Sequence, residues 1–160
     1  MLMRVIRFVR LPLLLILIWA VARFSLGLAG VPYAPRGNAM FSIVGLTWIS
    51  CLYFGAMSGR VGGFGWLGAF LVGVVLGFFA QLLIFTATAV SLAANLNTYF
   101  VHWDALNVPE GTTPPTGTIL TGRAVGLVIG ALISGVVALI GRALFSALAP
   151  RCDAPVERVP

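Results

Sequence analysis

Few residues of this chain could do chemistry, and they lie far apart in the sequence. Arg23 is the only charged residue well inside an apolar stretch, where an ionisable side chain is costly and often functional. Two interpretations stay open for it: the long side chain reaches the membrane surface or forms an ion pair, or it binds a lipid or other ligand. Measured from Leu11, Arg23 lies about 18 Å into the membrane, so its guanidinium reaches a depth similar to that of Gln81. We predict a contact of Arg23 with Asp104, with Gln81 or with free carbonyl groups at the outer end of the third predicted helix.

A second candidate group contains the only histidine, His102, together with Asp104 and Glu110. A histidine beside a carboxylate can transfer protons, but residues two apart on a helix point in different directions. One histidine without a nearby cysteine also supplies too few ligands for zinc. With Arg36, these residues are the candidates for an enzyme acting at the outer surface. The simpler interpretation is that these are polar residues of the membrane interface, because it needs no catalytic geometry. We therefore expect no catalytic residue, metal site or cofactor.

The sequence also contains no known binding motif and does not support binding to nucleic acid. The sequence has no phosphate-binding loop, zinc-peptidase motif or serine-hydrolase motif. The formal charge is +6, but all ten basic residues are arginines and most of them flank apolar stretches, whereas nucleic-acid binding needs a basic cluster. Cys51 and Cys152 lie in an apolar stretch and in the C-terminal tail, so we expect no disulfide between them.

The composition predicts an all-α integral membrane protein. Hydrophobic residues make up 60% of the 160 residues, charged residues only 9%, and the mean hydropathy is +1.06. Soluble domains carry about 25% charged residues. These values exclude a water-soluble fold.

Four apolar stretches are long enough to cross a hydrocarbon core of about 30 Å, which takes about 20 helical residues. We expect one transmembrane domain over residues 1–149 and a flexible cytoplasmic tail over residues 150–160. The third stretch exceeds one membrane thickness, so its helix should tilt or project. The four predicted spans are residues 11–31, 39–58, 63–94 and 123–142.

The first stretch resembles a signal peptide, because three arginines precede an apolar run and Ala29 and Gly30 offer a weak cleavage site. The apolar residues continue to Val31, however, which is long enough to span a membrane. Cleavage and an uncleaved anchor are both open, and the length favours the anchor.

The outer loop over residues 95–122 is the one long polar connection. Its first part places apolar residues at helical spacing, which predicts a short amphipathic helix at the membrane interface. Its second part, residues 108–117, contains three prolines and should be extended. The apolar stripe consists of Leu96, Tyr99, Phe100, Trp103 and Leu106.

The orientation follows from the arginines, because basic loops are retained in the cytoplasm. With both termini in the cytoplasm, seven arginines lie inside, and only Arg36 and Arg123 lie outside. We therefore expect a cell (inner) membrane protein of a bacterium with cytoplasmic N- and C-termini. The seven are Arg4, Arg7, Arg10, Arg60, Arg142, Arg151 and Arg158.

Rows of small residues predict how the helices pack, because membrane helices approach closely where side chains are small. The third span has one row that includes Gly73 and Gly77, and the fourth span has another at a spacing of four. The partner of each row could lie in the same chain or in another subunit. The row of the fourth span is Gly122, Gly126, Gly130, Ser134 and Ala138.

Three functions remain open. Abundant small-residue faces and scarce polar groups favour a non-enzymatic accessory or scaffolding subunit of a membrane complex. An oligomeric transporter or channel for small molecules or lipids is the alternative, although no Asp or Glu lies in any predicted span, where proton coupling would need one. A membrane enzyme at the outer surface is the third. The expected partners are the lipid bilayer and other membrane subunits or a second copy of the chain, and not nucleic acid.

Overall fold

The computed structural model describes residues 1–31, 42–112 and 114–148. Within these ranges the chain is helical and forms no β-strand. Three helices are long and apolar enough to cross a membrane: α2 (Arg10–Leu28), α4 (Trp66–Ala93) and α6 (Thr116–Leu148). The prediction of an all-helical protein with membrane-spanning helices is thereby confirmed.

The N-terminal segment forms two helices instead of one. The first, α1 (Leu2–Phe8), ends at Val9, whose φ of −99° and ψ of 14° are not those of a regular helix, and α2 begins at the next residue. Pro12 lies in the first turn of α2, where its missing N–H costs no hydrogen bond. Val5, Val9 and Ile16 are fully buried. The stretch that resembles a signal peptide therefore contributes to the core.

The next helix, α3 (Ile43–Met57), is the shortest of the apolar helices. The Ser42 hydroxyl accepts a hydrogen bond of 2.9 Å from the N–H of Gly45 and so caps its N-terminus. Its 15 residues give a length of about 22 Å, less than a hydrocarbon core of about 30 Å. The helix starts later than the span predicted over residues 39–58, of which 39–41 lie outside the described ranges.

The helix predicted over residues 63–94 is α4, which has 28 residues and a length of about 42 Å. It begins after Gly65 and ends before Asn95, whose φ of 51° lies in the left-handed region. Asparagine tolerates this conformation, which ends many helices. As predicted, α4 is longer than one hydrocarbon core is thick.

The connection from α4 to α6 contains less helix than the apolar stripe predicts. Only α5 (Trp103–Leu106) is helical there. Residues 96–102 form no helix, and Thr98 and Phe100 are buried. The Thr98 hydroxyl lies 2.7 Å from the Ser91 hydroxyl at the end of α4. The segment thus packs on the helix ends and does not continue as one amphipathic helix.

α6 is longer at both ends than the span predicted over residues 123–142. It has 33 residues and a length of about 50 Å. Pro114 and Pro115 directly precede it, where the fixed φ of proline suits a helix start. The outer loop therefore ends before Thr116 and not at residue 122. The boundary predicted near Arg123 concerns the membrane span and stays a prediction, because a helix can project beyond the bilayer.

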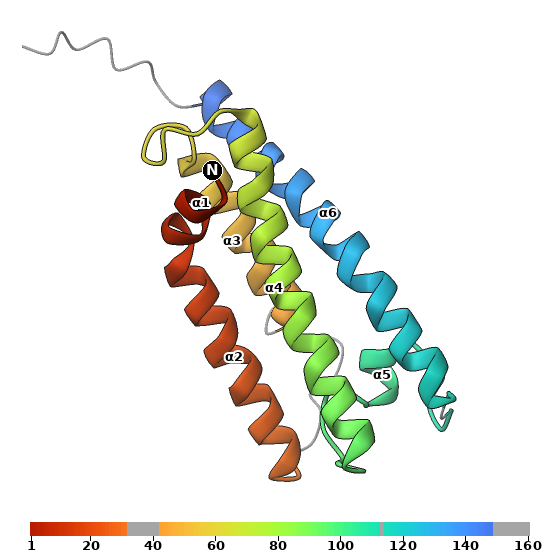
Figure 1. The fold of residues 1–160 in the computed structure, drawn as a ribbon. Helices are drawn as coiled ribbons and strands as arrows, with labels where there is room; N and C mark the ends of the chain where they lie inside the picture. The colour runs from red at the N-terminus through yellow and green to blue at the C-terminus, as the bar shows by residue number, and fades with distance from the viewer. Residues whose placement is uncertain (32–41, 113, 149–160) are drawn as a thin grey trace, which may run out of the picture.

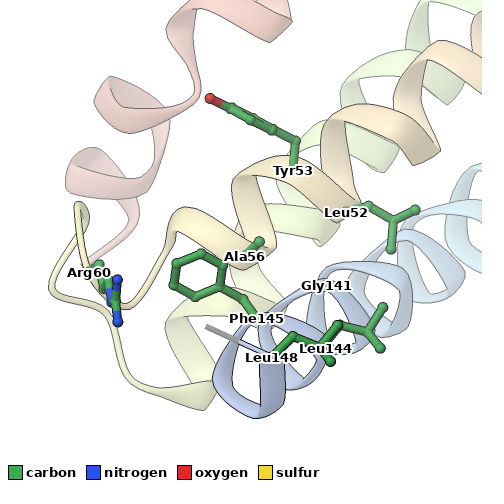
Figure 2. Close-up of a pocket in the computed structure, with 8 residues that line it drawn as sticks. All are labelled: Leu52, Tyr53, Ala56, Arg60, Gly141, Leu144, Phe145 and Leu148. Carbon is green, nitrogen blue, oxygen red and sulfur yellow. The ribbon is translucent and has the colours of Figure 1, made fainter. Parts of the chain in front are cut away.

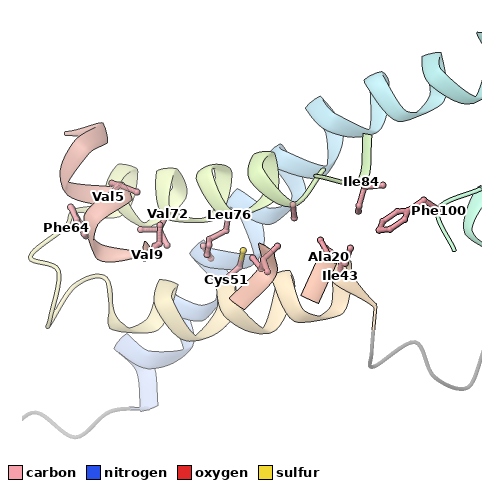
Figure 3. Close-up of a cluster of buried hydrophobic side chains, with 13 residues drawn as sticks. Val5, Val9, Ala20, Ile43, Cys51, Phe64, Val72, Leu76, Ile84 and Phe100 are labelled. Atoms are coloured by element: carbon pink, nitrogen blue, oxygen red, sulfur yellow. The ribbon is translucent and has the colours of Figure 1, made fainter. Parts of the chain in front are cut away.

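The helix ends and the connections between them lie at two opposite ends of the molecule. In Figure 1 the N-terminus, α1, the connection from α3 to α4 and the last turns of α6 lie at one end, which we call the α1 end. The last turn of α2, α5 and the start of α6 lie at the other, which we call the α5 end. α6 packs on α3 and α4, and α2 packs on the other side of α4 and on α3. The buried apolar side chains between these helices are shown in Figure 3.

Candidate functional site

Arg142 joins the α1 end of α6 to the connection between α3 and α4. Its guanidinium donates to the carbonyl oxygens of Phe64 and Gly65 and lies 3.3 Å from the Ser58 hydroxyl oxygen. Its Cζ lies 5.0 Å from the centre of the Trp66 ring. A planar guanidinium presents several donors in a fixed geometry, so this single side chain holds a turn of the backbone in place.

Arg123 has the corresponding role at the α5 end. Its Nη2 donates to the carbonyl oxygens of Phe100 at 3.2 Å and Ala105 at 3.0 Å. These two residues flank the start of α5, so Arg123 holds the connection against α6. Arg123 and Arg142 lie about 28 Å apart along one helix at about 1.5 Å per residue. That separation is close to the thickness of a hydrocarbon core, about 30 Å.

Arg23 lies beside the connection that follows α4. Its Cζ is 5.6 Å from the ring centre of Tyr99, a distance at which a cation and an aromatic face attract each other. The Tyr99 hydroxyl donates to the carbonyl oxygen of Val31 at 2.8 Å. At Gly27 an added Cβ would lie 2.8 Å from the Tyr99 nitrogen, so α2 touches this segment directly. The ion pair of Arg23 with Asp104 stays a prediction.

Gln81 lies against α6. A Cβ added at Gly130 would lie 2.6 Å from Gln81 Nε2, and a Cβ added at Gly126 would lie 3.9 Å from Gln81 Oε1. The amide group therefore occupies the space that these two glycines leave beside α6. Gln81 thus packs against α6, and its predicted contact with Arg23 stays a prediction.

The two rows of small residues meet along the half of α6 nearest the α1 end. An added Cβ at Gly73 would collide with the backbone of Ser134, and one at Gly77 with the Ser134 side chain. Ala138 is fully buried, and its carbonyl group leaves no room for a Cβ at Gly55 of α3. These small residues therefore pack within the chain.

The same row has few neighbours toward the α5 end. Apart from its chain neighbours and the nearby backbone of α6 itself, no atom of the described residues lies within 4 Å of a Cβ added at Gly122, which is exposed. At Gly126 the nearest atom is Gln81 Oε1, at 3.9 Å. Figure 1 shows α6 diverging from α4 in this direction. The row thus divides into a packed half and an open half.

Three of the four outer-surface candidates, His102, Asp104 and Glu110, lie in the connection that contains α5. His102 Nδ1 accepts a hydrogen bond of 3.3 Å from the backbone N–H of Asp104 and caps α5. The centre of its ring lies 5.3 Å from that of Trp103, and the two rings are tilted by 34°. Glu110 is exposed, and Arg36 lies outside the described residues. Within the described ranges no three His, Cys, Asp or Glu residues come together as metal ligands would.

A groove of about 620 Å³ lies between α3 and α6 at the α1 end (Figure 2). Arg60, just beyond α3, places its Cζ 5.1 Å from the centre of the Phe145 ring of α6. Apart from Arg60 and the hydroxyl of Tyr53, the side chains that line the groove are apolar. The lining residues are Leu52, Tyr53, Ala56, Arg60, Gly141, Leu144, Phe145 and Leu148.

Sequence reasoning missed the contacts of Arg123 and Arg142 and the groove. It used Arg60, Arg123 and Arg142 only to orient the chain. Their positions at the ends of apolar helices were the available signal. The carbonyl groups that they bind lie 18 to 78 residues away in the sequence, which no local pattern can identify.

The fold and the positions of these residues form the basis for a functional proposal. No family model, curated protein or solved structure matches this chain.

Proposed function

We propose that the protein belongs to the cell (inner) membrane of a bacterium and crosses the bilayer four times, with both termini in the cytoplasm. α2 runs from the α1 end to the α5 end, and α4 starts again at the α1 end (Figure 1). The chain between them must therefore return, and α3 is its apolar helix. At about 22 Å, α3 can cross where the bilayer thins locally or where Arg60 extends its side chain to the surface.

The arginine distribution supports the orientation. Arg4, Arg7, Arg10, Arg60 and Arg142 lie at the α1 end. Arg123 lies at the α5 end, to which the two described acids, Asp104 and Glu110, also belong. Basic loops are retained in the cytoplasm, so the α1 end is cytoplasmic in this proposal.

Within the membrane, we propose a non-enzymatic accessory or scaffolding role. The observation that carries this proposal is the division of α6 into a packed half and an open half. Arg123, Arg142 and His102 all bind backbone groups of the chain itself. The open half of α6 exposes Gly122 at a spacing that elsewhere on the same helix receives a neighbouring helix. Small residues of this kind allow a second membrane helix to approach closely.

The test compares assembly with folding. The protein is extracted in a mild detergent, and its native mass is measured with any chain that remains bound stoichiometrically. We expect a second chain, either another subunit or a copy of this one, and we expect Gly122→Leu to release it without lowering the melting temperature of the protein. A side chain at residue 124 points to another side of the helix, so Ala124→Leu serves as the matched control and should retain the partner.

Two results would contradict the accessory role. One is a protein that carries no stoichiometric second chain. The other is an assembly that Gly122→Leu and Ala124→Leu leave equally intact.

A further inference from the structure

The groove between α3 and α6 has a closed end and an open end. Leu52 and Gly141 close it, because an added Cβ at Gly141 would collide with the Leu52 carbonyl group. From there the two helices separate toward the α1 end, and the groove ends at Arg60 and Leu148 (Figure 2). Eight residues of α3 separate Leu52 from Arg60, or about 12 Å at about 1.5 Å per residue. The groove therefore extends along α3 from Leu52 to the α1 end of the molecule.

The walls of the groove suit a hydrocarbon chain. Leu52 and Ala56 of α3 face Leu144 and Phe145 of α6 across it. Leu52, Leu144 and Leu148 are exposed to 39%, 52% and 78%, so the described part of the chain leaves much of this apolar surface uncovered. The volume of about 620 Å³ is within the range of small-molecule sites, about 300–1,000 Å³.

The open end of the groove carries a positive charge. Arg60 is exposed and lies over the Phe145 ring, which forms part of the wall. The α1 end also carries the arginines of α1, and the two acids within the described ranges, Asp104 and Glu110, lie at the α5 end. A negatively charged group is therefore favoured where the apolar walls end. Basic pockets between membrane helices on the cytoplasmic side bind anionic lipid headgroups in this way.

We propose that this groove binds one phospholipid with an anionic headgroup, its acyl chain between α3 and α6 and its phosphate at Arg60. A second copy of the chain fits less well, because it would bring another arginine-rich end into contact with the first. The proposal depends on the insertion of the protein in a bilayer with this end at the membrane surface, and it is independent of the accessory role.

Native mass spectrometry of the protein released from nanodiscs provides the test. The discs contain equal amounts of phosphatidylglycerol and phosphatidylethanolamine in both leaflets, so the direction of insertion does not affect the result. We expect one phosphatidylglycerol molecule to remain bound in preference to phosphatidylethanolamine. Arg60→Gln should reduce its retention about fivefold, the factor for one charge at a membrane surface. Arg7→Gln, an exposed arginine at the same end that does not line the groove, should change it little.

A second pair of variants tests the acyl-chain part of the groove. Ala56→Phe fills the space between the walls and should abolish retention of the bound lipid. Val136→Phe, on an exposed surface of α6 that does not line the groove, should leave it unchanged. Melting temperatures close to that of the unaltered protein would confirm that each variant folds.

Three results would overturn the proposal. They are equal retention of both lipids, an equal loss with Arg7→Gln and Arg60→Gln, and crosslinking of a photoreactive residue at position 144 to a second copy of the chain instead of to lipid. A protein that binds the lipid as expected but carries no partner chain would refute only the accessory role.

Discussion

The two halves of α6 have the same pattern of small residues, but a neighbouring helix packs closely against only one of them. Near the α1 end, Ser134, Ala138 and Gly141 lie directly against the backbone of α3 or α4. Near the α5 end, Gly122 has no described atom within 4 Å of an added Cβ. The helix there is held by the contacts of Arg123 with the connection that contains α5. Helix contact stabilises one half of α6, and hydrogen bonds to a loop stabilise the other.

The difference shows that a row of small residues permits close approach without specifying which helix approaches. All five members of the row have the same spacing, but the angle between α4 and α6 decides which of them touch a neighbour. In a membrane, where the hydrophobic effect does not drive helices together, such contacts provide much of the packing energy. Substitutions in the two halves should therefore have unequal effects.

The largest effect is expected for Gly141→Ala. A methyl group there would collide with the Leu52 carbonyl group, and backbone atoms cannot move aside as a flexible side chain can. We expect the free energy of unfolding to fall by about 3 kcal/mol. Reversible unfolding in detergent, compared with the unaltered protein, measures this loss. A decrease below about 0.5 kcal/mol, the size expected for a surface position, would show that α3 and α6 do not pack as described.

Arg142→Gln should have the next largest effect. The shorter, neutral side chain cannot reach the carbonyl groups of Phe64 and Gly65 together with the Ser58 hydroxyl. Hydrogen bonds from a charged donor contribute about 1.5–3 kcal/mol, so we expect a loss of about 2 kcal/mol. Arg142→Lys retains the charge but not the planar geometry. Its melting temperature should therefore lie between that of Arg142→Gln and that of the unaltered protein. Full recovery by lysine would contradict the importance of the several directed hydrogen bonds.

Arg123→Gln should act locally. The connection around α5 loses its hydrogen bonds from α6, while the packed half of the helix is unaffected. We expect a loss of about 1.5 kcal/mol and faster hydrogen exchange at the amides of residues 98–107, with no change at α3. If the exchange increased equally in α3 and in this segment, the two ends of α6 would not be independent.

The smallest effect is expected for Gly122→Ala, the counterpart of Gly141→Ala on the same helix. An added methyl group meets no described atom within 4 Å, so the free energy of unfolding of the isolated protein should change by less than about 0.5 kcal/mol. A loss as large as that of Gly141→Ala would show that the two halves of α6 are packed alike.

The sequence could predict the class of the fold because apolar composition and length are direct measures of membrane spanning. It predicted the long α4, but it did not use Pro114 and Pro115 to place the start of α6. It also predicted too much helix after Asn95, where Thr98 and Phe100 instead pack on the helix ends. Apolar spacing alone does not distinguish a helix face from a loop that packs on a core.

The contacts of the candidate residues were less predictable than the fold. The predicted contacts of Arg23 and Gln81 rest on their depth in the helices, and depth does not give the direction in which a side chain points. Gln81 packs toward α6, and Arg23 toward Tyr99. The groove at Arg60 is formed by two helices whose register is set by contacts at Gly55 and Gly141. Such a register depends on tertiary packing and has no local signal.

Cysteine labelling in intact cells tests the central claim, the fourfold crossing, most directly. In a Cys152→Ser background, in which the one remaining cysteine is the buried Cys51, a cysteine replaces Met3, Val61 or Glu110 in turn. Met3 and Val61 are exposed to 73% and 64%. A membrane-impermeant thiol reagent should modify Glu110→Cys in intact cells, and Met3→Cys and Val61→Cys only after the membrane is permeabilised. Modification of Val61→Cys from outside while Met3→Cys stays protected would show that α3 does not cross the membrane, and it would contradict the fourfold crossing.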